Sequence, residues 1–342
     1  MDPLLSEQIL IEKHPDWQGE RFLVISPGRS QLGWQLRLQH PAAQVQAWYC
    51  DLYQATEARA TAAEAQAAID VVCAVDLPEA SYDAVFMPVL KRGEAELTRE
   101  LMQQAHQRLK VGGYLAMSVD NPTDTWLHEQ MRAILQKVTV QQHSQGRAYW
   151  GRKTGPLKRE RDFSCEFQFR DEESLVTAYS RPSVFSHRKL DDGARQLIKQ
   201  VEIGPQDNVL DYGCGSGVVA LACARRTSGK VIGVDANSRA LECLKRGAQA
   251  NSLQNIDTIL NADGHLGLSI KMDVALANPP YFGDQKIWQH FADACLSCLR
   301  SGGSLLIVTK QPNWFAEYLD PKLESLSVAE SGHYYLVHGW AL

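Results

Sequence analysis

The sequence predicts an α/β protein with two tandem Rossmann-like domains, each a doubly wound, mostly parallel sheet whose seventh strand is antiparallel. Three observations lead to this prediction. An apolar strand runs into a glycine-rich loop at residues 211–217, and an Asn-Pro-Pro-Tyr run at residues 278–281 follows another apolar strand. One α/β unit also recurs in both halves of the chain. With 342 residues, the chain is long enough to form two cores of ordinary size.

The recurring unit consists of a strand, a loop, an amphipathic helix, a Gly-Gly turn and a second strand. In the first copy, Asp83 lies in the strand and Gly112 opens the turn 29 positions later. In the second copy, Asp273 and Gly302 are separated by the same 29 positions. Equal spacing with a shared acid indicates a duplication. The first copy lacks both the glycine-rich loop and the Asn-Pro-Pro-Tyr run, so we expect it to have kept the fold and lost the site.

The charge balance divides the chain into three parts. Residues 1–142 hold 12 Lys and Arg against 18 Asp and Glu, residues 143–200 hold 12 against 8, and residues 201–342 hold 11 against 14. We therefore expect a first domain over 1–142, a basic linker over 143–160 and a second domain over 161–342. A basic stretch in an acidic chain is compatible with an RNA partner, and a solvated linker is the alternative. The candidate RNA contacts are Arg152, Lys153, Lys158 and Arg159.

The composition, 44% hydrophobic and 22% charged, is that of an ordinary globular protein. No apolar run is long enough to span a bilayer, and the first residues lack the features of a signal peptide. The eight cysteines are scattered, which favours reduced thiols and a cytoplasmic protein. Cys295 and Cys298 have no partners at metal-ligand spacing, so we expect no metal. The sequence does not predict an oligomeric state, and a monomer is the default assumption.

The glycine-rich loop predicts a cofactor site. Three glycines after a buried strand allow close approach of a ligand, and Asp235 ends the next strand, where it can accept hydrogen bonds from two ribose hydroxyls. Asp211 would repel a pyrophosphate but suits the ammonium group of a methionine moiety. A glycine turn that only packs a helix on a strand is the alternative. The candidate cofactor-binding residues are Asp211, Gly213, Cys214, Gly215, Gly217, Asp235, Ala236, Ala262, Asp263 and Asn278.

The Asn-Pro-Pro-Tyr run predicts chemistry on an amino group. The side-chain carbonyl of Asn278 and the backbone carbonyl of Pro279 can each accept one N–H of an exocyclic amine, which aims its lone pair at a methyl donor. Pro280 stiffens the loop, and Tyr281 offers a face for base stacking. No strong base is needed, because the proton can leave after the methyl group arrives. A turn that merely closes the strand is the alternative.

With these motifs, the second half resembles class I S-adenosylmethionine-dependent methyltransferases that carry the Asn-Pro-Pro-(Tyr/Phe) signature. The whole chain is similar to the ribosomal RNA guanine-N2 methyltransferases of the small-subunit methyltransferase C family. This resemblance implies S-adenosylmethionine as cofactor, a guanine of ribosomal RNA or of a ribosomal subunit as acceptor, and a first domain that recruits substrate or stabilises the second. It also implies that Phe185 and Ser186, with Tyr281, line the substrate pocket.

Three other functions remain open. A protein glutamine-N5 methyltransferase of the release-factor type uses the same Asn-Pro-Pro-Tyr chemistry, although that family carries a small helical domain instead of a duplicated first half. A DNA adenine methyltransferase would also use it. The third is a non-catalytic RNA-binding or assembly factor that binds cofactor without turnover, against which Asn278 and the intact glycine loop both count.

Overall fold

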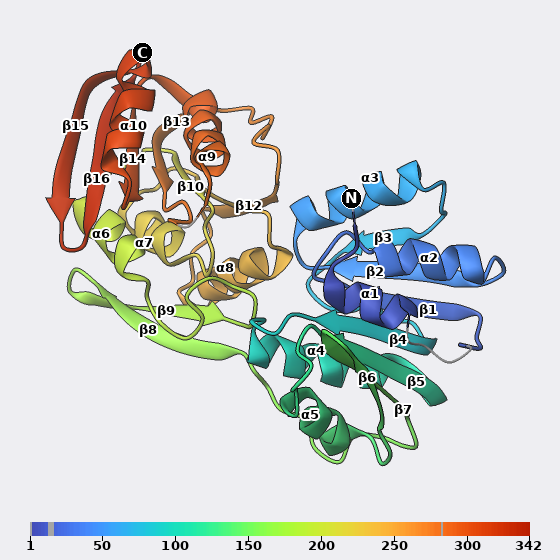
Figure 1. The fold of residues 1–342 in the computed structure, drawn as a ribbon. Helices are drawn as coiled ribbons and strands as arrows, with labels where there is room; N and C mark the ends of the chain where they lie inside the picture. The colour runs from blue at the N-terminus through green and yellow to red at the C-terminus, as the bar shows by residue number, and fades with distance from the viewer. Residues whose placement is uncertain (1, 13–16, 282) are drawn as a thin grey trace. The chain divides into compact units, whose positions relative to one another are not determined.

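The computed structural model describes residues 2–12, 17–281 and 283–342 and divides into two compact units, Met1–Phe163 and Ser164–Leu342 (Figure 1). Each unit contains a seven-stranded sheet. In each sheet, the second strand from one edge is antiparallel to both of its neighbours. The predicted pair of doubly wound domains is thereby confirmed. In the described part of the chain, no helix is long and apolar enough to cross a membrane.

Unit 1, drawn from blue to green in Figure 1, has the strand order β3-β2-β1-β4-β5-β7-β6. Its strands are β1 (Arg21–Ile25), β2 (Gln44–Tyr49), β3 (Asp70–Cys73), β4 (Tyr82–Val89), β5 (Leu109–Val119), β6 (Thr139–His143) and β7 (Gly146–Arg152). Its helices are α1 (Leu5–Glu12), α2 (Gln31–Gln39), α3 (Leu52–Glu64), α4 (Ala95–Arg108) and α5 (Trp126–Ile134).

Unit 2 begins with an antiparallel hairpin, β8 (Cys165–Asp171) and β9 (Ser174–Ser180), and its sheet has the order β12-β11-β10-β13-β14-β16-β15. The strands of this sheet are β10 (Val209–Tyr212), β11 (Val231–Asp235), β12 (Ile256–Leu260), β13 (Met272–Ala277), β14 (Leu299–Thr309), β15 (Leu323–Ser331) and β16 (Tyr334–Ala341). The helices are α6 (Asp192–Gln200), α7 (Val218–Arg226), α8 (Ser238–Ala250), α9 (Gln285–Cys298), α10 (Pro312–Leu319) and the short η1 (Asp320–Lys322).

The central strands of unit 2 are apolar because both faces of the sheet are covered. Along β13, Val274 and Leu276 enter the core on one face, while Ala275 and Ala277 enter the core on the other. Residues that alternate between two buried faces produce a continuous apolar run in the sequence. This burial leaves the carboxyl ends of the strands as the places where polar loops emerge.

The acid shared by the two copies has the same structural role in each unit. Asp83 accepts hydrogen bonds from backbone amides at the start of β1 and pairs with Lys110 at 2.6 Å. Asp273 accepts from the backbone N–H of Asn208, just before β10, at 2.8 Å and pairs with Arg300 at 2.7 Å. Each carboxylate therefore ties the fourth strand of its sheet to the start of the first, which accounts for the repeated spacing.

The prediction of a basic linker over residues 143–160 is wrong for residues 146–152. These form β7, the antiparallel strand of the first sheet, and Ala148 and Tyr149 are buried opposite Ser118 and Met117 of β5. The glycines and cations of this segment suggested an exposed connection, but the segment pairs with β5 and is therefore part of the sheet. The boundary between the units accordingly lies after Phe163.

Candidate active site

Four loops of unit 2 emerge side by side at the carboxyl edge of the sheet. Tyr212, the last residue of β10, is paired with Val234 of β11 and with Ala277, the last residue of β13. Asp235 is in turn paired with Leu260, the last residue of β12. The chain proceeds from β10 toward β12 in one direction and from β13 toward β14 in the other. Ligands of doubly wound sheets bind at such a switch point, so the sheet brings the predicted cofactor and catalytic loops together.

The glycine loop between β10 and α7 needs its glycines for two different reasons. Gly213, Gly215 and Gly217 all have positive φ, at 78°, 53° and 81°. A Cβ on Gly217 would lie 2.5 Å from a methyl group of Leu244, so this glycine permits packing of α7 on α8. A Cβ on Gly215 would meet no atom within 4 Å, so this glycine faces open space. The backbone around Gly215 is therefore the part of the loop that a ligand can approach.

Cys214 is buried within this loop, and its backbone N–H donates to the carbonyl of Val234 at 2.9 Å. Burial raises the pKa of its thiol well above the usual value, and the nearby carboxylates raise it further. The side chain is therefore a protonated spacer, and a contact of Cys214 with the cofactor stays a prediction. No group of three or more His, Cys, Asp and Glu side chains among the described residues could hold a metal ion.

Asp235 connects the end of β11 to the glycine loop. Its carboxylate accepts from the backbone N–H of Gly215 at 2.9 Å and from that of Asn237 at 2.8 Å. Ala236, half-buried, lies between Asp235 and Asn237, the N-cap of α8. The carboxylate is thus held beside the open face of the loop, where the sequence predicts a partner for ribose hydroxyls.

Asp211 is almost fully buried, and its carboxylate accepts from the backbone N–H of Ala220 in the first turn of α7 at 3.0 Å. Burial, with a smaller contribution from the charge of Asp235, raises the pKa of this carboxyl group to about 7. Without a ligand, Asp211 is therefore partly protonated near neutral pH. A cation brought beside it would favour the ionised form.

Cofactor affinity is expected to rise with pH, if the ammonium group of the cofactor pairs with Asp211. Below a pKa of about 7 the carboxyl group must lose its proton to form this pair, so the affinity should increase by up to about tenfold per pH unit and level off above pH 7. Calorimetry at pH 6 in buffers of different ionisation enthalpy should detect the released proton. If the affinity does not change with pH, or changes equally in Asp211→Asn, the ammonium group does not pair with Asp211.

The loop after β12 is held in shape by its own side chains. Asn261 accepts from the backbone N–H of Gly264 at 2.8 Å, and the Asp263 carboxylate accepts from the Asn261 side chain and from the N–H of His265, both at 2.9 Å. These hydrogen bonds lower the pKa of Asp263, the one from His265 contributing most. Asp263 is exposed and ionised, and Ala262 is half-buried. A contact of Ala262 and Asp263 with the adenine of a cofactor stays a prediction.

Both polar atoms of the side-chain amide of the catalytic candidate Asn278 form hydrogen bonds. Its Nδ2 donates to the carboxylate of Asp191 at 2.9 Å, and its Oδ1 accepts from the hydroxyl of Tyr281. The same oxygen of Asp191 caps α6 by accepting from the backbone N–H of Ala194 at 3.0 Å. Gly193 lies against this group, since a Cβ there would collide with the Tyr281 hydroxyl. Asp191 therefore fixes which way the Asn278 amide faces, and the amide oxygen lies near Gly193 of α6, 3.0 Å from where a Cβ on that residue would be.

Sequence reasoning did not select Asp191 as a site residue. The signal available was the Asp-Asp-Gly run, which indicates the N-cap of a helix and resembles the segment before the first strand in the methyltransferase C family. Its contact with Asn278 joins residues 87 positions apart and depends on the folded sheet.

Tyr281 belongs to an aromatic and cationic group beside Asn278. Its ring lies 5.3 Å from the ring of Tyr334, and Lys310 Nζ lies 5.2 Å and 5.0 Å from the two ring centroids. Burial raises the pKa of Tyr281, so its hydroxyl is a donor. Trp288, a core residue, donates from Nε1 to the carbonyl of Pro280 at 3.0 Å and so anchors the loop. Tyr334 and Lys310 were missed because nothing in the sequence links them to the motif.

The carbonyl of Pro279 accepts no hydrogen bond from any described residue, although the residue itself is buried. The oxygen of Asn278 is occupied by Tyr281 in this structure. A target amine could therefore bind Pro279 directly and would displace the Tyr281 hydroxyl to reach Asn278.

The segment containing Phe185 and Ser186 has an unusual backbone. Ser183, Ser186 and Arg188 have positive φ, at 78°, 55° and 75°, a conformation that non-glycine residues seldom adopt. Asn237 anchors the segment by donating to the carbonyl of Ser183 at 2.9 Å. Phe185 is 53% exposed. Clusters of strained residues occur at ligand sites, and the anchor lies two positions after Asp235, so a place for Phe185 and Ser186 at the pocket entrance stays a prediction.

Two of the four candidate RNA contacts are engaged within unit 1. Arg152 donates to the carbonyl of Gly112 at 2.7 Å and stacks over the ring of Tyr114 at 4.0 Å. Lys153 caps the end of α4 by donating to the carbonyls of His106 and Leu109, both at 2.8 Å. Lys158 and Arg159 are exposed and are the two that remain as candidates for phosphate.

The fold and the strand-end site define unit 2 as a methyltransferase domain of the Rossmann-like class. Residues 175–338, which make up most of this unit, match the model of the methyltransferase small domain family. A ribosomal RNA small subunit methyltransferase C of Pseudomonas syringae pv. syringae is 31% identical over 147 residues, 42% of this chain and 44% of the relative. The enzyme of the same name from Pseudomonas syringae pv. tomato is 26% identical over 332 residues, 90% of each chain.

Among solved structures, the following one matches across both units. The T. thermophilus 16S rRNA N2 G1207 methyltransferase, solved in complex with AdoMet and guanosine, superposes with a TM-score of 0.78 at 22% identity. The superposition covers 98% of this chain and 92% of that one, and it shows that the two share the tandem fold. The family model, the aligned relatives and this shared fold together confirm the resemblance drawn from the sequence. The first relative above is matched over less than half of its length, and the second over nearly all of it.

Proposed function

We propose that this protein transfers the methyl group of S-adenosylmethionine to the exocyclic N2 amine of a guanine in ribosomal RNA. The observation that carries the proposal is the position of Asn278, whose amide lies at the strand end next to the glycine loop and is oriented by Asp191. Relatives named as small subunit methyltransferases C, one of them aligned over 90% of both chains, support the choice of acceptor.

The proposed cofactor fits the residues at the strand ends. Gly215 leaves its backbone open, Asp235 offers a carboxylate for the ribose, and Asp211 offers one for the ammonium group. The cofactor supplies an electrophilic methyl group. The chain contributes two rigid oxygen acceptors that hold the amine, which is catalysis by positioning. A base in a duplex would have to turn out of its helix to reach them.

The proposal is tested by incubating the protein with labelled S-adenosylmethionine and, separately, small ribosomal subunits, large ribosomal subunits, free ribosomal RNA and a peptide release factor. We expect label in RNA. Label in the release factor would favour a glutamine-N5 methyltransferase, and cofactor binding with no label in any acceptor would favour a non-catalytic assembly factor. An RNA acceptor would place the protein's action in the cytoplasm, with ribosomes.

Asp191 is expected to act through Asn278. In Asp191→Ser the shorter side chain still caps α6 but no longer reaches the Asn278 amide, so kcat should fall by about tenfold or more while cofactor affinity is retained. Steady-state kinetics with a melting curve checks this. Asp192→Ser changes an exposed neighbouring acid and is the matched control, and Asp191→Asn, which keeps an acceptor oxygen, should restore most of the activity. Equal losses in both serine variants would contradict the role of Asp191.

Lys158 and Arg159 are proposed to meet RNA phosphates. Replacing both with glutamine should reduce the slope of log affinity against log salt by up to about two, because each phosphate contact contributes somewhat less than one. Filter binding across a salt series measures this slope. Lys91 and Arg92, an adjacent exposed pair, provide the matched control. An unchanged slope in the first variant would mean that residues 158 and 159 are only a solvated connection.

A further inference from the structure

One pair of equivalent positions is in contact in both units, but with opposite charges. The residue directly after β5 is Asp120, and the residue directly after β14, the equivalent strand, is Lys310. Eight positions after the acid that the two copies share, unit 1 has Lys91 and unit 2 has Tyr281. Asp120 accepts a hydrogen bond from the backbone N–H of Lys91, whereas Lys310 lies over the ring of Tyr281.

The acid of unit 1 has a structural role that a lysine cannot take over. Asp120 holds the loop after β4 by accepting a hydrogen bond from its backbone. An ammonium group has no acceptor, so Lys310 cannot hold the loop after β13 in this way. Unit 2 therefore has a positive charge beside the Asn-Pro-Pro-Tyr run in place of a backbone anchor, which indicates a role outside the fold.

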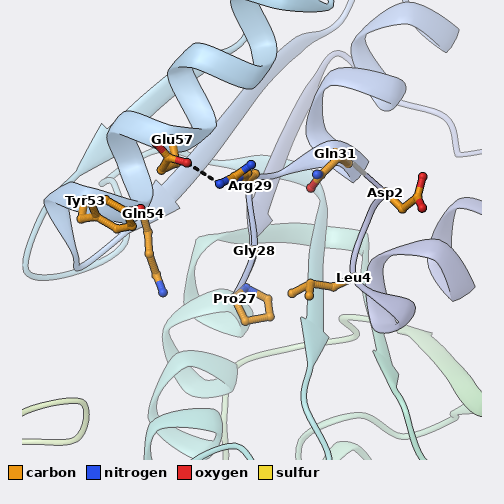
Figure 2. A pocket seen from close by; sticks show the side chains of 9 residues that line it. All are labelled: Asp2, Leu4, Pro27, Gly28, Arg29, Gln31, Tyr53, Gln54 and Glu57. Carbon is orange, nitrogen blue, oxygen red and sulfur yellow. Dashed lines mark ion pairs between the residues drawn. The ribbon is translucent and has the colours of Figure 1, made fainter. Parts of the chain in front are cut away.

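The two units also differ in the space that a ligand could use. In unit 1 the side chain of Leu4 lies against the loop after β1, and a Cβ on Gly28 would be 2.8 Å from one of its methyl groups (Figure 2). In unit 2 a Cβ on Gly215 would meet no atom within 4 Å. The acid thus occurs in the unit whose loop is covered, and the cation occurs in the unit whose loop is open.

The charge of Lys310 is available to a ligand. The side chain is exposed, and within the described residues it forms no ion pair with a carboxylate. Its Nζ lies instead 5.2 Å and 5.0 Å from the ring centroids of Tyr281 and Tyr334. Such contacts are weak at exposed sites, and the stem of a lysine is flexible. An anion can therefore attract Nζ away from the rings and leave the face of Tyr281 to a base.

Lys310 also lies close to the atoms that are proposed to hold the target amine. The hydroxyl of Tyr281 donates to Oδ1 of Asn278, and Lys310 contacts the ring of the same tyrosine. A base that enters this site leaves its phosphates at the protein surface, where Lys310 is exposed. A lysine binds a phosphate as a compact positive charge.

We propose that Lys310 binds a backbone phosphate next to the target guanine. This contact makes the site of unit 2 prefer a nucleotide of an RNA chain to a free nucleoside or to the amide of a peptide. The inference rests on the function proposed above, and it adds the part of the RNA strand that the site recognises besides the base.

Guanosine and its 5′- and 3′-monophosphates, which differ only in the phosphate, test the contact. Each is added to the full chain saturated with S-adenosylhomocysteine, and its affinity is measured by ligand-observed magnetic resonance. We expect at least one monophosphate to bind about tenfold more tightly than guanosine, because the phosphate gains a charge-assisted contact. This difference should disappear in Lys310→Gln and remain in Lys310→Arg. Equal affinities in the unaltered protein, or a difference that survives in Lys310→Gln, would overturn the proposal.

Steady-state turnover on RNA shows whether the contact serves the reaction. Lys310→Gln should raise KM for the RNA acceptor by about tenfold and leave kcat within about twofold, since the lost contact is made to the strand and not to the reacting amine. Lys199→Gln, which removes an exposed lysine at the end of α6, is the matched control and should change neither constant. A lower kcat with an unchanged KM would mean that Lys310 only supports Tyr281, which contradicts a phosphate contact.

A failure of this contact and a failure of the proposed function give different results. If the unaltered protein methylates no RNA, the proposed function fails, and the role of Lys310 fails with it. If the unaltered protein methylates RNA and Lys310→Gln has the same KM, only the role of Lys310 fails.

Discussion

Replacing Asn278 with alanine is expected to lower kcat by at least about a hundredfold and to leave the affinity for S-adenosylmethionine nearly unchanged. The variant loses the amide oxygen that is proposed to hold the target amine, together with the hydrogen bonds to Asp191 and Tyr281 that fix it. Loss of one positioned polar group at a reacting centre costs about 10²–10³ in rate. Single-turnover methyl transfer measures the effect, and calorimetry measures the affinity.

Asn278→Asp provides a sharper comparison. It keeps the size and one oxygen, but it brings a second carboxylate next to Asp191, so we expect it to be as inactive as the alanine variant. A retained rate in Asn278→Ala would assign the chemistry to another group, and an equal loss of cofactor affinity would make residue 278 part of the cofactor site alone.

Replacing Asp235 with alanine is expected to weaken cofactor binding by about tenfold or more, because two charge-assisted hydrogen bonds to ribose hydroxyls are lost. The structure adds a second reason. Asp235 also holds the backbone of Gly215, so the open part of the glycine loop loses its support. Isothermal titration with S-adenosylmethionine and with S-adenosylhomocysteine checks this.

Asp257→Ala is the matched control for Asp235, since Asp257 is an exposed acid on the neighbouring strand that pairs with Lys230 at the surface. Its affinity for cofactor should equal that of the unaltered protein. If Asp235→Ala binds as tightly as this control, the ribose assignment is wrong, whatever happens to turnover.

Local sequence patterns were sufficient to predict much of the fold. The apolar runs of β10 and β13, the glycines between strand and helix, and the equal spacing from Asp83 to Gly112 and Asp273 to Gly302 are all short-range features. They predicted the two sheets and the loops that meet at the strand ends, while the antiparallel seventh strand followed from the resemblance to methyltransferases. The register of β10 with β11 and β13 then brought those loops together.

Contacts between distant residues could not be predicted in this way. Asp191 orients Asn278, although the two residues are 87 positions apart in the sequence. Lys310, which directly follows β14, lies over the ring of Tyr281. Lys153 illustrates a second limit, because its charge suggested a contact with RNA, while the structure shows that its amine caps α4. The residue type alone does not show whether a charged side chain binds a ligand or stabilises the fold. Only its contacts in the folded protein distinguish these two roles.

The most direct test of the central claim is the identity of the methylated nucleoside. RNA from a strain lacking this protein should be incubated with the purified protein and labelled S-adenosylmethionine, digested, and separated by chromatography with mass spectrometry. The account predicts label in N2-methylguanosine and in no other nucleoside. Label in N6-methyladenosine or on a ribose, with none in N2-methylguanosine, would contradict it.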